Sequence, residues 1–80
     1  MIGFYDILEM GNELEKKMVK NDIKSNNIFS FEVPSEDFKK IDEDIYYRQF
    51  PDGKDFEPSE NEIQITFKHL TIIIKKEGQN

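Results

Sequence analysis

Few residues in this sequence could carry chemistry. His69 is its one histidine, and histidine is the side chain that most readily acts as a general base near neutral pH. It lies in an apolar, β-branched run, where a hydrogen-bonded structural histidine is more common than a catalytic one. Without cysteine, the chain offers neither a thiol nucleophile nor a zinc site of the usual Cys/His kind. We expect no enzymatic activity, no cofactor and no metal.

Acidic residues are concentrated in the middle of the chain. Glu32 to Glu62 contains eleven acidic and four basic residues, whereas the rest has six acidic and seven basic ones. Their spacing does not match a calcium loop, because the sixth position from Asp42 should be glycine and is Tyr47. Such a block usually forms a solvated surface, but it can also attract a basic protein. Nucleic acid is a poor partner, because its binding requires clustered Lys and Arg.

Six residues in this acidic segment are our candidates for binding a protein partner. Tyr and Arg are enriched at the centres of protein interfaces, and here they follow a run of three acidic residues. The candidates are Asp42, Glu43, Asp44, Tyr46, Tyr47 and Arg48. The competing interpretation is structural, with the tyrosines alternating between the core and the solvent along a strand.

The stretch 62–76, EIQITFKHLTIIIKK, is the segment that the other elements must cover. In a straight strand Ile63, Ile65 and Phe67 would lie on one face, and Leu70 with the isoleucines that follow on the other. A bulge near residues 68–70 would bring both sets to one face, and we favour it. A tight turn is less favoured, since glycine, asparagine and aspartate are absent there. A continuous strand would leave apolar residues on both faces for a partner chain to cover.

Upstream of this stretch we expect a helix, a strand and a second helix. Phe4, Ile7, Gly11, Leu14 and Met18 form one helical stripe, and the glycine within it indicates a close contact with another element. Residues 29–33 alternate as a strand that Pro34 ends. A helix then starts at Ser35. The spacing of its apolar residues would let it continue through Ile45, but we end it near Asp42.

The tyrosines at 46 and 47 favour an extended conformation, so we predict a strand from about Asp44 or Ile45 to Phe50. Pro51-Asp52-Gly53 predicts a turn, after which Phe50 would pair with Phe56 in a hairpin. The elements together predict one small α+β domain over residues 1–80 in the order α-β-α-β-β. We expect a mainly antiparallel sheet of three to four strands, with one or two helices on one face.

The composition limits where the protein could act. No apolar run reaches the roughly 20 residues that span a bilayer, and the first residues lack the basic region of a signal peptide. We therefore expect a cytoplasmic protein that does not bind membranes. Its bias toward isoleucine and lysine is common in small reading frames of low-GC bacteria and their phages.

Two functional hypotheses follow. The first is a protein-binding or inhibitor module that presents its acidic middle segment to a basic partner. The second is an assembly module that forms a homodimer through the C-terminal strand or a helix face, because a small domain without disulfides often gains stability by oligomerisation.

Overall fold

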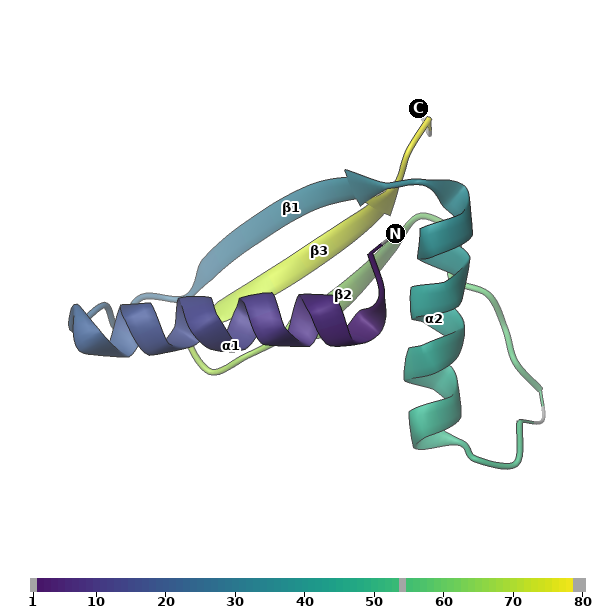
Figure 1. Ribbon diagram of the computed structural model, residues 1–80, viewed down its shortest axis with the longest axis horizontal. Coiled ribbons are helices and arrows are strands. Elements are labelled where there is room, and N and C mark those ends of the chain that lie inside the picture. Colours follow the sequence, from purple (N-terminus) through teal and green to yellow (C-terminus); the bar gives the residue numbers. More distant parts are fainter. Residues whose placement is uncertain (1, 54, 79–80) are drawn as a thin grey trace.

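The computed structural model describes residues 2–53 and 55–78. They form two helices and a three-stranded sheet (Figure 1), namely α1 (Phe4–Lys20), β1 (Asn27–Val33), α2 (Ser35–Gln49), β2 (Glu62–Thr66) and β3 (Leu70–Lys76). The predicted α+β class and the order α-β-α-β-β are confirmed. The last two strands are not those expected, however, because no strand forms at residues 44–50 and the stretch 62–76 supplies both β2 and β3.

The sheet is mixed, with β3 in its centre and the strand order β1-β3-β2. β1 runs parallel to β3 and places Phe29 beside Ile72. β2 runs antiparallel to β3 and places Ile65 beside the same residue. The expected predominance of antiparallel pairing is therefore not found. The long connection from β1 through α2 and β2 lets β3 enter the sheet in the direction of β1.

The stretch 62–76 is two strands joined by a tight turn, not one bulged strand. Because the chain reverses at residues 67–69, Ile63 lies beside Ile74 and Ile65 beside Ile72. The two apolar sets therefore share one face. The turn requires no glycine, since none of its three residues has a positive φ.

A contact from α1 closes this turn. The backbone N–H of His69 donates to Oε1 of Glu15 at 2.7 Å, and the imidazole Nδ1 contacts Oε2 of the same carboxylate. Both side chains are largely buried. His69 is thus a structural residue that joins the β2–β3 hairpin to α1. The turn lacks the glycine, asparagine or aspartate that usually stabilises a tight turn, and a side chain 54 positions away in sequence holds it instead.

The Glu15 contact makes stability depend on pH. Burial opposes ionisation of this carboxyl, but the hydrogen bonds from His69 and the charges of His69 and Lys68 lower its pKa below the ordinary value. A carboxyl with a lowered folded pKa stabilises the fold above its unfolded pKa, about 4.3, and loses that contribution as the pH falls through the folded value. We expect Glu15→Gln to lower the melting temperature at neutral pH.

This melting-temperature difference should narrow as the pH falls below about 4. Thermal denaturation followed by circular dichroism across this range measures it, with the exposed Glu9→Gln of the same helix as the control. A difference that stays constant down to the acid limit would show that ionisation of Glu15 contributes nothing.

The glycine of the α1 stripe makes the close contact that the sequence indicated. A Cβ added to Gly11 would lie 2.2 Å from Cζ of Phe67, well inside van der Waals contact. The ring of Phe67, in the hairpin turn, therefore packs directly against the α1 backbone. Any larger residue at position 11 must displace it.

The core lies on one face of the sheet, and both helices pack there. Ile7 and Met18 from α1, and Phe38 and Ile41 from α2, join the inward residues of the strands in one cluster. The buried strand residues are Val33, Ile63, Leu70, Ile72 and Ile74. The opposite face carries exposed side chains such as Ser30 and Gln64. In Figure 1, α1 crosses in front of the sheet and α2 stands at one end of it.

The predicted strand at 44–50 is wrong, because α2 continues to Gln49. Phe38 and Ile41 are buried and Ile45 packs against the same core, so the helical spacing left open in the sequence is the one adopted. Packing of this stripe outweighs the preference of two tyrosines for strands. No helix among the described residues is long and apolar enough to cross a membrane.

The predicted turn at residues 51–53 is confirmed, but the hairpin around it is not. The Gly53 N–H donates to the Phe50 carbonyl at 3.0 Å, and Gly53 has a φ of +67°. The described residues between α2 and β2 contain no strand. The rings of Phe50 and Phe56 instead both pack against the ring of Tyr46 on α2.

Candidate functional site

The connection between α2 and β2 is fixed to α2 by one buried carboxylate. Asp42 is 9% exposed and accepts hydrogen bonds from the backbone N–H of Ser59 at 2.7 Å and from its hydroxyl at 2.8 Å. Asp42, predicted to bind a partner, is therefore turned inward. Its role is to hold the segment 55–61 against the helix.

We expect Ser59→Ala to lower the free energy of unfolding by about 1 kcal/mol, because it removes one of the two bonds to Asp42. Faster amide hydrogen exchange at residue 59 should accompany this loss, and urea denaturation measures the free energy. Ser25→Ala, at an exposed serine, is the matched control. If both variants are equally stable, the hydroxyl does not hold the segment.

Four aromatic rings gather where this segment meets the end of α2. The ring of Tyr46 lies 5.1 Å from that of Phe50, 4.9 Å from that of Phe56 and 5.4 Å from that of Tyr47. We call these four residues the aromatic cluster. Tyr47 is 44% exposed and Phe50 54% exposed, so the cluster presents ring surface to the solvent. Such exposed rings are typical of interaction sites.

Two carboxylates lie near enough to the aromatic cluster to affect its titration. Burial, and then the negative charges of Asp55 and Glu57 together with neighbouring Tyr47, raise the pKa of Tyr46 above its ordinary value. These two carboxylates therefore act directly on the cluster. Glu43 precedes Tyr47 by four residues and so lies on the same side of α2.

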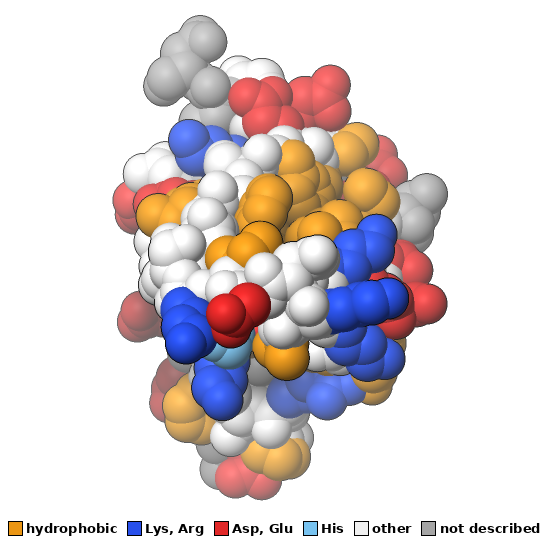
Figure 2. Space-filling model, turned by 90° about the vertical axis from the view of Figure 1, so that its left-hand side faces the viewer, with side chains coloured by type: hydrophobic (Ala, Val, Ile, Leu, Met, Phe, Trp, Pro, Cys, Tyr) orange, Lys and Arg blue, Asp and Glu red, His pale blue; other side chains and the backbone are white. Residues whose placement is uncertain are grey.

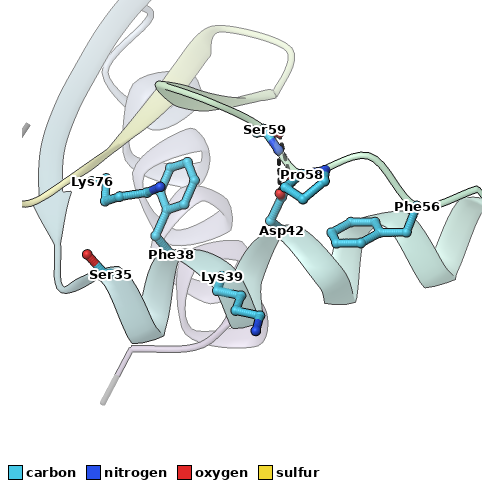
Figure 3. Close-up of a pocket in the computed structure, with 8 residues that line it drawn as sticks. All are labelled: Ser35, Phe38, Lys39, Asp42, Phe56, Pro58, Ser59 and Lys76. Atoms are coloured by element: carbon cyan, nitrogen blue, oxygen red, sulfur yellow. Dashed lines mark hydrogen bonds between the residues drawn. The ribbon is translucent and has the colours of Figure 1, made fainter.

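Two hollows adjoin Phe56 of the cluster, and Asp42, Phe56 and Ser59 line both. The larger, about 260 Å³, also has Phe38, Lys39 and Lys76 in its wall (Figure 3). The ammonium group of Lys76 lies 5.1 Å from the centre of the Phe38 ring. The smaller, about 200 Å³, is lined in addition by Ile45, Tyr46, Gln49 and Glu57. The smaller hollow thus combines an aromatic wall with a carboxylate.

Arg48, also predicted to bind a partner, makes intramolecular contacts. Its guanidinium carbon lies 4.9 Å from the centre of the Phe4 ring and 4.6 Å from that of the Tyr5 ring. It also donates a hydrogen bond to the Tyr5 hydroxyl. Arg48 therefore connects α2 to the start of α1, and cation–π contacts of this kind contribute about 0.5–1 kcal/mol each at exposed positions.

Of the six predicted residues, Tyr46 and Tyr47 belong to the aromatic cluster, and Glu43 and Asp44 precede Tyr47 by four and three residues, which places both beside it on α2. Asp42 and Arg48 serve the fold. Phe50, Asp55, Phe56 and Glu57 were not among the predicted site residues. Their aromatic and acidic types were a signal, but the predicted hairpin assigned the two phenylalanines to strand pairing.

Within residues 2–53 and 55–78 no three histidine, aspartate or glutamate side chains gather in a way that could hold a metal ion. Comparison with protein-family models, curated protein sequences and solved structures finds no match.

Proposed function

We propose that this protein is a small protein-binding module whose aromatic–acidic surface receives a basic segment of a partner. This surface consists of the aromatic cluster together with Glu43, Asp44, Asp55 and Glu57. The observation that carries the proposal is the exposure of Tyr47 and Phe50 among these carboxylates. Exposed aromatic rings beside several carboxylates suit one kind of ligand group, namely a positive charge at the end of an apolar stem.

The chemistry of that surface favours lysine or arginine side chains. An ammonium or guanidinium group over a tyrosine or phenylalanine ring gains about 0.5–1 kcal/mol at an exposed site. Carboxylates near the rings add attraction and accelerate encounter with a basic partner. The hollow of about 200 Å³ beside Tyr46 and Glu57 could take the methylene stem of such a side chain.

A titration with model peptides tests this function. The probe is a short peptide of alternating arginine and glycine, and its counterpart carries glutamate in place of arginine. We expect the arginine peptide to shift the amide resonances of residues 43–50 and 55–59, and added salt to weaken the shifts. Equal shifts with both peptides, or shifts located elsewhere, would contradict the proposal.

Variants make the test specific. Tyr47→Ala should weaken binding of the arginine peptide by about two- to fivefold, the loss of one cation–π contact. The pair Asp55→Asn and Glu57→Gln should weaken it further. The pair Glu9→Gln and Glu62→Gln makes the same change in net charge at exposed positions outside this surface. If that control pair weakens binding as much, net charge alone attracts the peptide and no site exists.

A further inference from the structure

β1 has a free edge with unused hydrogen-bonding groups. At its two ends, Asn27 and Val33 direct backbone groups toward β3 and its flanking residues. Backbone groups alternate in direction along a strand, so Ile28, Ser30 and Glu32 direct their N–H and C=O groups away from β3. No other strand of the described residues pairs with this edge, and Figure 1 shows β1 on the outside of the sheet.

An apolar groove follows this edge. A hollow of about 230 Å³ between α1 and β1 is lined by Ile2, Asp6, Ile7, Met10 and Phe31. Ile2 and Met10 are each 39% exposed, and neighbouring Phe29 is 38% exposed. Figure 2 looks roughly along α1 and β1. It shows hydrophobic side chains gathered on the side of the molecule that faces the viewer, with lysine or arginine side chains beside them.

We propose that the occupant of this edge is a second copy of the chain, paired antiparallel through β1 with Ser30 on the two-fold axis. This register pairs Ser30 with Ser30 and Ile28 with Glu32 of the other copy, so the outward-directed backbone groups become partners. The core-side residues of β1 then lie on the same face of the joined sheet in both copies, and Phe29 lies beside Phe31 of the other copy. Such aromatic cross-strand pairs are favourable, and no like charges are opposed.

The charges of α1 fit the same arrangement. Asp6 and Met10 line the groove. Glu13 follows Asp6 by seven residues and Lys17 follows Met10 by seven, so both lie on the same side of the helix. This side is therefore acidic in its first half and basic in its second. A two-fold axis sets the two α1 helices antiparallel, which brings the acidic half of one toward the basic half of the other. Opposite charges in this arrangement fix register and orientation.

The other edge of the sheet is a weaker candidate. β2 has five residues against the seven of β1. Its outward-directed backbone groups belong to Glu62, Gln64 and Thr66, because the bond from the Phe67 N–H to the Leu70 carbonyl fixes the alternation. These three residues are polar and exposed, and none of them lines a hollow described above.

Sedimentation equilibrium over a range of concentrations tests the proposal, with a matched pair of proline variants. Ser30→Pro removes a donor from the free edge of β1, and Gln64→Pro removes one from the free edge of β2. Neither donor is used within the sheet, and proline is tolerated at such edge positions. We expect the wild type to approach twice 9.5 kDa, Ser30→Pro to raise the dissociation constant at least about tenfold, and Gln64→Pro to leave it within about twofold.

A charge variant on α1 and its control on α2 give a second, independent measurement. Lys17→Glu lies on the groove side and should weaken association about threefold or more. Lys40→Glu makes the same change of charge on α2, at a residue that does not line the groove, and should have the smaller effect. Both positions are exposed, so these variants decide the matter if Ser30→Pro fails to fold by circular dichroism.

Three results would overturn the proposal. They are a wild type that stays monomeric at every concentration, a folded Ser30→Pro variant that associates like the wild type, and equal effects of the two lysine variants. Loss of association only in Gln64→Pro would assign the interface to β2 instead. Because the peptide titration can be run on a monomer, failure here leaves the proposed aromatic–acidic surface intact.

Discussion

Replacing Ile72 by alanine is expected to lower the free energy of unfolding by about 2–5 kcal/mol. This side chain is fully buried in the central strand, between Phe29 of β1 and Ile65 of β2. Its removal leaves a cavity that the strands and both helices cannot easily fill. A domain of this size has a total stability of about 4–12 kcal/mol, so the variant should be partly unfolded or close to it.

The neighbouring residue provides the control. Ile73 points to the open face between Ser30 and Gln64 and is only half-buried, so Ile73→Ala should cost about 1 kcal/mol or less. Urea denaturation of both variants, with an unchanged dependence on urea concentration, measures the difference. If Ile73→Ala were as damaging as Ile72→Ala, the second face would be covered and the two-layer arrangement would be wrong.

The second large effect is expected at Gly11, where its sign depends on another residue. In an open helix, Gly→Ala stabilises by about 1 kcal/mol. Here the new Cβ would meet the ring of Phe67 at 2.2 Å, and overpacking costs about 1–3 kcal/mol. We expect Gly11→Ala alone to destabilise the protein by up to about 2 kcal/mol.

In a Phe67→Ala background the same change should stabilise the protein by about 1 kcal/mol, because only the helix preference remains. A double-mutant cycle by urea denaturation measures this coupling. Effects of Gly11→Ala that are equal in both backgrounds would show that the ring moves aside without cost. Leu14→Ala in the same two backgrounds supplies a comparison at a half-buried position of the same stripe.

The sequence was sufficient where local pattern and packing agree. The helical stripe from Phe4 to Met18 predicted α1 and its buried face, and Gly11 predicted a close contact. The strand before Pro34 and the helix start at Ser35 were also correct. In each case the spacing of apolar residues matches the period of the element that forms.

The errors occur where a distant contact decides the local structure. The turn at 67–69 lacks the usual turn residues and is held by Glu15 of α1. The C-terminal half of α2 contains residues that prefer strands, but its apolar stripe packs on the core. Between Phe67 and Leu70 the apolar residues change from odd-numbered to even-numbered positions. This shift was visible in the sequence, and it marks a turn between two strands. The sequence identified the candidate surface only in part, since the aromatic cluster depends on how segment 55–61 folds back onto α2.

The central position of β3 has a consequence for how the protein is made. Asn27 of β1 pairs with Leu70 of β3, more than forty residues later, and β2 also has β3 as its neighbour. During synthesis β1 therefore emerges from the ribosome before its partner strand does, and Phe29 and Phe31 stay without that partner until β3 follows. Sheets built from such distant pairings form slowly, and unpaired strands in nascent chains are prone to aggregate. The ribosome must thus deliver the chain as far as β3 before any strand of this sheet can be paired.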